Sequence, residues 1–276
     1  ALSQEEVLRR PGGDGEEEPA PDPPLMPAQQ EALDVILPHL ERGDGRFLLH
    51  GVTGSGKTEV FIRLVRHTLR RGRSAIILVP EIALPPQMAR WVRGRCGPVA
   101  AVRHSRPSAG ERFDEWRRIR RGDARVVIGA RSAIFAPVEK LGLVVVDEEH
   151  EQTYLSDRHP RYDAREVAAF RCREEGATLL LSSATPSILS FAKARRGDYT
   201  LLEMPHRVMN RPLPTVEVVG MRAELAQGNR SVFSAPLLSA LRACMERGEQ
   251  AMLLMNRRGY HAFVSCRACG HVMKCP

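Results

Sequence analysis

The feature that most constrains the fold is the run Gly51-Val-Thr-Gly-Ser-Gly-Lys-Thr58, which matches the pattern G-x-x-x-x-G-K-[ST] in full. It follows the apolar run Phe47–His50 and opens a helical stretch near residues 58–71, the context that this motif requires. Glycines in such a loop let backbone amides turn inward and hold phosphate groups at a helix N-terminus. The run therefore predicts a nucleotide-phosphate site within an α/β sheet.

The side chains of this loop have separate expected roles. Lys57 is expected to reach the β- and γ-phosphates, and the Thr58 hydroxyl to help hold Mg²⁺. The flanking strand and helix disfavour the alternative, an ordinary glycine-rich turn. A lysine here is informative because the chain has so few. The other expected nucleotide-binding positions are Gly51, Thr53, Gly54, Ser55 and Gly56.

Beyond this loop, short apolar runs alternate with helical stretches. The runs are continuous, as expected of central strands covered on both faces, and the alternation indicates a parallel sheet with right-handed crossovers. Pro27 opens a preceding helix that runs to about Leu40. The predicted strands are Phe47–His50, Ala75–Val79, Val99–Val102, Arg125–Ile128, Leu143–Val146 and Leu179–Leu181. The predicted helices lie near residues 58–71, 86–95, 108–121, 163–174 and 187–195.

Three segments are expected along the chain. Residues 1–24 are acidic and rich in proline and glycine, which is typical of a linker. Residues 25–206 form the nucleotide-binding domain, and residues 207–276 hold a proline-rich connector and a second βα pattern. That pattern predicts a helix from about Ala235 to Arg247 and a strand at Gln250–Met255. Because both ends look cut, we expect an internal piece of a longer protein.

A second chemical signal follows the run Leu141–Val146, a buried strand that delivers acids at its carboxyl end, where ligands sit in open α/β sheets. Asp147 is placed to bind Mg²⁺, and Glu148 to polarise the attacking water as general base. A solvated acidic turn is the alternative reading. The position about ninety residues after the phosphate loop favours a site that hydrolyses a nucleoside triphosphate.

The neighbouring residues narrow the class. With His150 after the acids, the pattern D-E-x-H resembles superfamily 2 helicases, and His150 joins Lys57, Asp147 and Glu148 as an expected catalytic residue. Ser183-Ala184-Thr185 is similar to the element that couples the nucleotide site to nucleic acid, with Ser183 and Thr185 as coupling residues. Val79–Leu84 and Gly129–Ala133, with Arg131 and Ser132, resemble loops that touch the DNA backbone. Gln29 fits a glutamine that recognises adenine, or is a surface residue.

The wording of these motifs resembles the PriA family of replication-restart helicases over residues 25–276. It includes G-V-T-G-S-G-K-T-E-V, V-P-E-I-A-L, G-A-R-S-A-I-F, D-E-E-H-E, S-A-T-P-S and the run Asn256-Arg257-Arg258-Gly259-Tyr260 before the cysteines. The resemblance implies a RecA-like phosphate-loop NTPase lobe with a mostly parallel sheet, followed by an incomplete second RecA-like lobe. It also implies a 3′-to-5′ DNA helicase acting at forks and D-loops with primosome proteins and a single-stranded-DNA-binding protein.

The same resemblance assigns roles to two further groups of residues. Tyr154–Arg165 is similar to an aromatic-rich loop that links DNA contact to hydrolysis, in which Tyr154 and Tyr162 would stack on bases and Arg161 would contact phosphate. An exposed loop with incidental aromatics is the alternative. Cys266, Cys269 and Cys275 begin a zinc pattern whose remaining cysteines would lie beyond residue 276. His261 and His271 are less suitable substitutes, and Cys96, Cys172 and Cys244 are expected to be buried small hydrophobes.

Bulk properties set looser limits. The net charge of +8 suggests a polyanionic partner, although nearly all of the positive charge is arginine, which codon usage explains equally well. No apolar run approaches the ~18 residues of a membrane span. The thiols and the nucleotide site indicate a reducing cytoplasm.

Three rival functions share part of the pattern. A double-stranded DNA translocase of a restriction system would have the nucleotide motifs without the cysteine insertion. A non-catalytic platform that recruits primosome proteins would be expected to lose one of the four nucleotide-site residues. A small-molecule kinase would lack the D-E-E-H and S-A-T elements. Because the second lobe is incomplete and lacks its arginine fingers, we expect this chain alone to bind ATP·Mg²⁺, hydrolyse it poorly and not unwind DNA.

Overall fold

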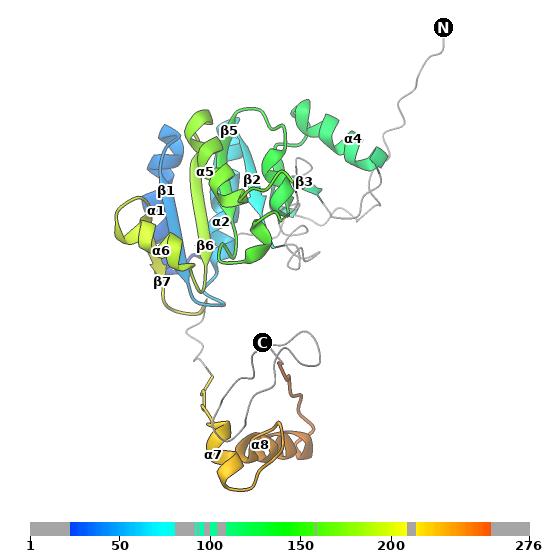
Figure 1. Cartoon of the computed structure of the whole chain (residues 1–276). Helices are drawn as coiled ribbons and strands as arrows, with labels where there is room; N and C mark the ends of the chain where they lie inside the picture. The colour runs from blue at the N-terminus through cyan, green and yellow to red at the C-terminus, as the bar shows by residue number, and fades with distance from the viewer. Residues whose placement is uncertain are drawn as a thin grey trace. The chain divides into compact units, whose positions relative to one another are not determined.

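The computed structural model describes residues 23–80, 92, 94–96, 100–103, 109–157, 159–208 and 214–254 (Figure 1). The chain divides into two compact units, residues 1–212 and 213–276, and each is described by itself. The predicted linker at residues 1–24 and the predicted helix near residues 86–95 lie largely outside the described residues. Within the described residues, no helix combines the length and the apolarity needed to cross a membrane.

The first unit is built on a seven-stranded sheet whose described pairings are all parallel. Its strand order is β3-β4-β2-β5-β6-β1-β7. The strands are β1 (Arg46–Gly51), β2 (Ser74–Leu78), β3 (Ala100–Arg103), β4 (Val126–Gly129), β5 (Leu141–Val146), β6 (Thr178–Ser183) and β7 (Thr200–Met204). Since all strands run the same way, their carboxyl ends meet at one edge of the sheet.

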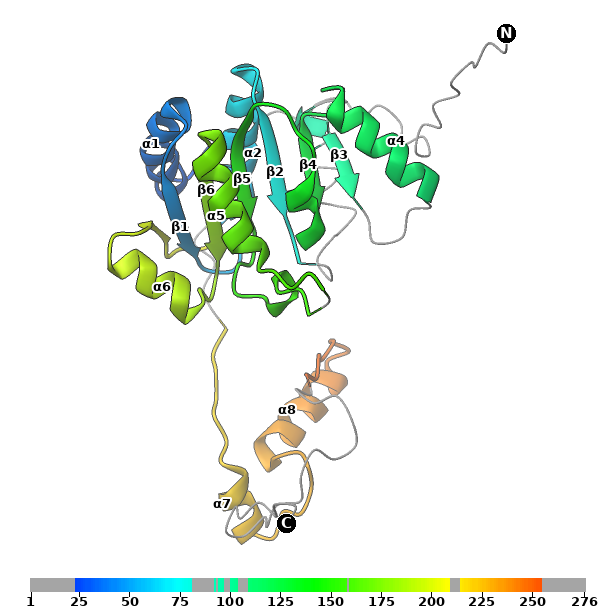
Figure 2. The ribbon, with the colours of Figure 1, turned by 45° about the horizontal axis from the view of Figure 1, so that its top comes forward.

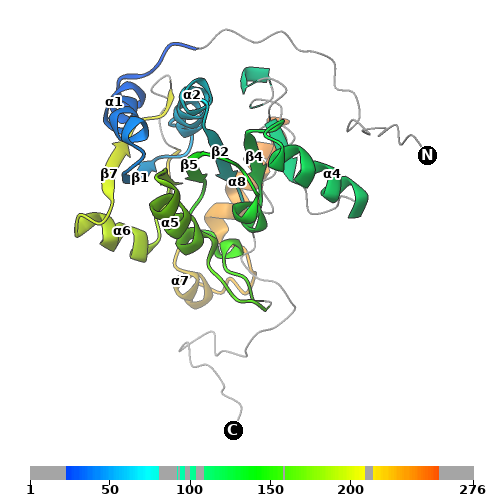
Figure 3. The ribbon, with the colours of Figure 1, turned by 90° about the horizontal axis from the view of Figure 1, so that it is seen from above.

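Helices cover both faces of this sheet (Figures 2 and 3). The described residues of this unit include the α-helices α1 (Pro27–Arg42), α2 (Lys57–Arg70), α4 (Ala109–Arg120), α5 (Ala164–Glu175) and α6 (Ile188–Arg195). Two 3₁₀ helices, η3 (Arg131–Phe135) and η4 (Gln152–Tyr154), follow β4 and β5. The predicted parallel α/β architecture, that of a RecA-like lobe, is confirmed.

The apolar residues of the strands divide between two cores. In β1, Phe47 and Leu49 pack with α1 and α2, whereas Leu48 belongs to the core on the side of α5. In β5, Leu143 and Val145 face the first core and Val144 the second. Each fully buried side chain of this size stabilises the fold by about 1.5–3 kcal/mol. Burial on both faces explains why the strands are continuous apolar runs rather than alternating ones.

One strand of the first unit departs from the prediction. The six predicted strands form within about two residues of their expected bounds, but β7 was not predicted. As an edge strand it is only partly buried, and Glu203 interrupts its apolar pattern. The continuous apolar run that identifies the central strands is therefore absent from β7.

The second unit contains two described helices, α7 (Met221–Ala226) and α8 (Ala235–Glu246). The Glu224 carboxylate joins them, since it accepts hydrogen bonds from Asn229 Nδ2 and from the Ala235 amide, both at 2.6 Å. The predicted helix forms, but the predicted strand at Gln250–Met255 does not form in its described part, residues 250–254. No described strand of this unit lies beside it, and a strand without a partner has no ladder to stabilise it.

Candidate functional site

The phosphate loop lies at the carboxyl end of β1 and leads directly into α2. The Lys57 ammonium is buried in the loop, where Nζ donates a hydrogen bond of 2.7 Å to the Gly51 carbonyl oxygen. The Ser55 hydroxyl is also buried, and Oγ has no hydrogen-bond partner among the described residues. A buried ammonium and an unsatisfied hydroxyl are groups that a phosphate would partner. The loop therefore fits a nucleotide phosphate.

Gln29 of α1 lies against this loop. Its Oε1 accepts from the Met26 amide at 2.7 Å, and its Nε2 donates to the Gly56 carbonyl at 3.1 Å. Gly56 has φ +83°, and a Cβ atom there would lie only 2.3 Å from Gln29 Nε2. Gln29 is thus buried against the phosphate loop, which excludes the alternative reading of a surface residue.

The other expected loop residues lie in the same turn. Gly54 has φ +81°, and Gly51 is so close to Ser55 that a Cβ atom would lie 2.6 Å from its Oγ. Thr53 is exposed, and Thr58 is half-buried at the start of α2. The loop thus requires glycine where the sequence pattern places it.

Asp147 and Glu148 follow β5 at the same edge of the sheet as the phosphate loop. Burial raises the pKa of Asp147 to about 6, the Glu148 carboxylate adds to the rise, and Lys57 opposes it. Such a carboxyl favours a nearby cation. No group of three or more His, Cys, Asp or Glu side chains able to hold a metal occurs in the described residues. Mg²⁺ typically takes one or two carboxylates plus substrate phosphates, so Asp147 with Thr58 fits that ion.

The backbone of Glu148 is in the left-handed region, with φ +46°. For a residue other than glycine, asparagine or aspartate this conformation costs about 1–2 kcal/mol. The turn is held by three hydrogen bonds, from the Glu148 amide to Asp147 Oδ1, from the Glu149 amide to Ser182 O and from the Glu151 amide to Glu148 O. The expected general base thus stands in a strained turn just beyond the end of β5, and the surrounding hydrogen bonds hold it there.

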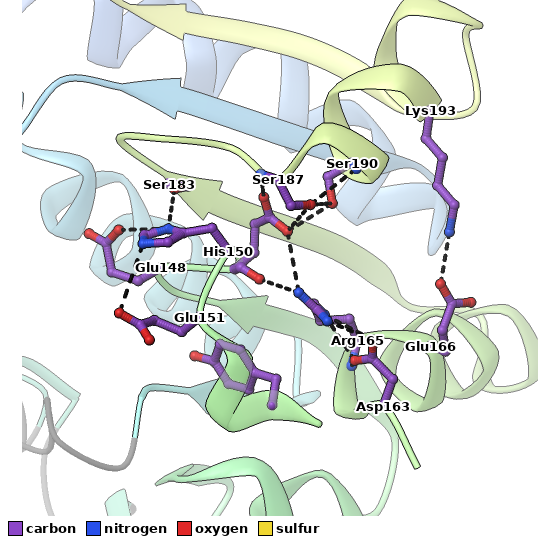
Figure 4. A network of polar contacts seen from close by, with 12 residues as sticks. Glu148, His150, Glu151, Asp163, Arg165, Glu166, Ser183, Ser187, Ser190 and Lys193 are labelled. Carbon is purple, nitrogen blue, oxygen red and sulfur yellow. Dashed lines mark hydrogen bonds and ion pairs between the residues drawn. The ribbon is translucent and has the colours of Figure 1, made fainter. Parts of the chain in front are cut away.

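His150 connects this acidic turn to the Ser183-Ala184-Thr185 segment after β6 (Figure 4). Its Nδ1 shares a hydrogen bond of 2.7 Å with Ser183 Oγ and lies 3.6 Å from Glu148 Oε2. Ser183 Oγ also accepts from the Thr185 amide at 3.0 Å. The structure therefore brings His150, Glu148, Ser183 and Thr185 together.

The sequence motifs assign no role to Glu149, yet it is the most buried acid of the site, with an exposed fraction of 0%. Its carboxylate accepts hydrogen bonds from the Ser187 amide, the Ser187 hydroxyl and the Ser190 hydroxyl. Its carbonyl oxygen accepts from Arg165 Nη1 at 2.6 Å. Two features of the sequence could have indicated these contacts. Glu149 is an acid with no expected nucleotide role, and Ser187 and Ser190 form an S-x-x-S pattern at a helix start.

The structure corrects the interpretation of Tyr154 as a base-stacking residue. Its ring is only 1% exposed, and its hydroxyl donates to the carbonyls of Leu78 at 3.1 Å and Asp147 at 2.5 Å. Burial, with the acids Asp147 and Glu148 nearby, raises the pKa of this phenol far above its usual range. A ring packed in the core has no free face for a base. Tyr154 instead stabilises the acidic turn through the hydrogen bond from its hydroxyl to the Asp147 carbonyl oxygen.

The remaining expected nucleic-acid residues lie in η3 and in the loop before α5. Arg131 Nη1 donates to the carbonyls of Leu155 at 2.7 Å and Thr153 at 3.3 Å, which ties η3 to the loop after β5. Tyr162 is half-buried and meets the Phe135 ring edge to face, with centroids 5.0 Å apart. Ser132 and Arg161 are exposed.

The cysteines divide into two groups. Cys172 is buried, as predicted, and burial raises the pKa of its thiol to about 12. Cys96 and Cys244 are half-buried rather than fully buried, and burial raises the pKa of Cys96 to about 11. The expected zinc and family-specific positions lie outside the described residues, namely Cys266, Cys269, Cys275, His261, His271 and residues 81–84 and 256–260.

Comparison with known proteins agrees with this geometry. The model of the DEAD/DEAH box helicase family matches residues 26–192, well over half of the chain. The chain therefore belongs to the DEAD/DEAH box helicase family, a class of ATP-hydrolysing enzymes of superfamily 2 that use Mg²⁺.

Its relatives place it more narrowly, and the resemblance to the PriA family is confirmed. The chain is 48% identical over 275 residues to the replication restart protein PriA of Bacillus subtilis, covering 99% of this chain and 34% of that protein. It is 47% identical over 259 residues to PriA of Synechocystis, covering 92% and 31%. The chain thus spans about a third of the length of these relatives. Among solved structures, the Pyrococcus furiosus Hef helicase domain aligns with a TM-score of 0.48 and 16% identity, covering 78% of this chain and 49% of that one.

Proposed function

We propose that the full reading frame encoding this chain produces an ATP-dependent 3′-to-5′ DNA helicase of replication restart, which assembles the primosome at stalled forks and D-loops. The observation that carries the proposal is the position of Lys57 and Asp147 at one edge of a parallel sheet, in a chain 48% identical to a replication restart protein. In this proposal the chain is one part of a longer cytoplasmic protein. By itself it binds ATP·Mg²⁺ but hydrolyses it poorly.

The residues of the site divide the hydrolytic work. Lys57 leaves the Gly51 carbonyl and binds the β- and γ-phosphates, while backbone amides from Gly51 to Thr58 hold the remaining oxygens. Thr58 and Asp147 would hold Mg²⁺, which would supply positive charge to neutralise the phosphate oxygens. Glu148 accepts a hydrogen bond from the attacking water and aligns it with the γ-phosphate. Gln29, which already contacts the loop, recognises the adenine.

DNA contact reaches this site through the hydrogen-bonded elements around it. Ser132 and Arg161, both exposed, and the half-buried Tyr162 are the proposed nucleic-acid contacts, with Arg131 holding the loop that carries the last two. His150 and Ser183, with Thr185, couple that contact to the acidic turn. Primosome proteins and a single-stranded-DNA-binding protein are the proposed partners. Zinc, bound in part by Cys266, Cys269 and Cys275, belongs to the same proposal.

The test is ATP turnover by the product of the full reading frame, with and without forked DNA. We expect strong DNA stimulation that is lost in Lys57→Ala, together with loss of tight nucleotide binding. Partial duplexes with a 3′ or a 5′ single-stranded tail then give the direction of unwinding. Turnover stimulated by blunt duplex without strand separation would favour a double-stranded DNA translocase. No stimulation by any DNA would favour a non-catalytic recruitment platform.

A further inference from the structure

Glu149 is bonded to three separate elements of the fold. Its amide donates to the Ser182 carbonyl in β6, and its own carbonyl accepts from Arg165 in α5. Its carboxylate accepts from the Ser187 amide at 2.6 Å and from the Ser190 hydroxyl at 2.8 Å, both at the start of α6. Every polar group of this residue is therefore bonded, and the partners lie in β6, in α5 and at the start of α6.

These contacts act on the backbone of Glu148. The peptide that joins Glu148 to Glu149 is held on both sides, because its nitrogen donates to Ser182 O and its carbonyl oxygen accepts from the Glu151 amide. With this peptide fixed, Glu148 has little freedom to leave its left-handed conformation at φ +46°. The direction of the Glu148 side chain therefore depends on the anchoring of Glu149.

The chemistry of the anchor also argues for a positioning role. Glu149 is fully buried, and its carboxylate lies 3.9 Å from the Arg165 guanidinium, which Asp163 holds from the other side (Figure 4). A buried ion pair is a weak source of stability, because the cost of removing both charges from water offsets their attraction. It is well suited to fixing one geometry, since each donor and acceptor must be matched.

We propose that Glu149 is a positioning residue for hydrolysis, which sets the conformation of Glu148 by fastening the acidic turn to α6 and α5. In this role Glu149 acts through Glu148 and not by contact with the nucleotide or the attacking water. The inference rests on the proposed function, in which Glu148 orients the attacking water. It adds that the start of α6, through Ser187 and Ser190, is part of the machinery that keeps Glu148 in place.

The test compares ATP turnover by variants of the full reading-frame product in the presence of forked DNA. Glu149→Ala is expected to lower kcat about 10- to 100-fold, a large part of what a general base contributes. The KM for ATP should change less than about twofold, because the phosphate loop is untouched. Glu149→Gln keeps an acceptor for the Ser187 amide and gains a donor for the serine hydroxyls, so it should restore kcat to within about threefold of the unaltered protein.

Because Glu149→Ala leaves buried serine groups without a partner, Ser190→Ala provides a milder variant. It removes one of the donors and should lower kcat about threefold, a loss near the net value of one hydrogen bond, while the melting temperature falls by no more than about 2–4 °C. Glu166→Ala is the matched control, since Glu166 is exposed and pairs with Lys193. Its kcat should stay within about twofold of the unaltered protein, as for an exposed ion pair.

The outcomes separate this inference from the proposed function. An unaltered protein without ATP turnover would overturn the proposed function and the positioning role with it. An active unaltered protein whose kcat is the same in Glu149→Ala, or in Ser190→Ala if the first variant does not fold, would overturn the positioning role alone. A fall in kcat for Glu149→Gln as large as for Glu149→Ala would also contradict it, since charge rather than geometry would then matter.

Discussion

The Nδ1 atom of His150 and the Oγ atom of Ser183 share a hydrogen bond of 2.7 Å, although Ser183 ends β6 and His150 lies in the turn that follows β5. Since β5 and β6 are neighbours in the parallel sheet, their carboxyl ends bring the D-E-E-H and S-A-T segments side by side. A displacement of one segment would therefore shift the other through this hydrogen bond. Coupling of DNA contact to hydrolysis requires such a mechanical connection.

Removal of the Ser183 hydroxyl tests this coupling. Ser183→Ala loses the bond to His150 and the bond from the Thr185 amide, so we expect stimulation of ATP turnover by forked DNA to fall about 5- to 10-fold, the effect of one or two hydrogen bonds. Nucleotide affinity, measured by fluorescence titration, should be retained. Glu151→Gln is the control, because Glu151 is half-buried and its carboxylate lies 3.8 Å from the other nitrogen of His150. Equal stimulation in Ser183→Ala and the unaltered protein would remove the coupling role.

Glu148→Gln tests the assignment of the general base. The amide keeps the size of the side chain but cannot accept a proton, so turnover should fall about 10²- to 10⁴-fold. Binding of ATP·Mg²⁺ should persist, as measured by isothermal titration calorimetry. A variant that still turns over ATP at the original rate would exclude Glu148 from this role.

Gly56→Ala tests the contact between the phosphate loop and Gln29. The new Cβ atom would lie 2.3 Å from Gln29 Nε2 at a residue with φ +83°. We expect a loss of unfolding free energy of about 2 kcal/mol or more, which combines backbone strain with a steric clash. Gly72→Ala is the matched control, with φ +71° and open space around its Cβ.

The two glycine variants are compared by urea denaturation. Gly72→Ala should show the backbone cost alone, about 1–2 kcal/mol. Only Gly56→Ala should also weaken nucleotide binding. Equal losses of stability and equal affinities in the two variants would mean that the Gln29 contact contributes nothing.

Tyr154→Phe separates a supporting role from a base-stacking role. The variant keeps the buried ring but leaves the Asp147 carbonyl without the phenol donor, so the unfolding free energy should fall by about 1–2 kcal/mol. Affinity for single-stranded DNA, measured by fluorescence anisotropy, should not change. Tyr162→Ala provides the comparison, because its half-buried ring is a proposed DNA contact. A loss of DNA affinity in Tyr154→Phe at unchanged stability would restore the stacking interpretation.

Cys172 gives the protein a definite dependence of stability on pH. Burial raises the pKa of this thiol from 9.0 to about 12, so the folded state favours the neutral form. The resulting stability is fully present below pH 9 and is lost as pH rises from there towards 12. Denaturation at pH 8 and at pH 10.5 should show a larger loss of unfolding free energy for the unaltered protein than for Cys172→Ala. Identical losses would mean that the thiol ionises equally well in the folded state.

The sequence was sufficient for the central strands and the phosphate loop, because both are encoded by local patterns. The continuous apolar run Leu143–Val146 predicts a buried strand without knowledge of its neighbours. The position of Gly56 in the loop motif predicts its positive φ. The contacts of Glu149 with Ser187 and Ser190 join residues about forty positions apart, so no local pattern reveals them. The same holds for Tyr154, whose aromatic ring reads as exposed until β2 and β5 are seen to enclose its hydroxyl. β7 was missed because an edge strand needs only one partner and little burial.

The positive φ of Glu148 has a consequence for how this chain can vary over generations. The backbone there favours glycine, asparagine or aspartate, while the proposed chemistry demands glutamate. Selection for a more thermostable protein would reward Glu148→Gly, which relieves the strain and removes the base at once. Laboratory evolution on heat resistance alone would therefore drift towards inactive descendants at this position, and only a screen that also scores catalysis would retain the acid.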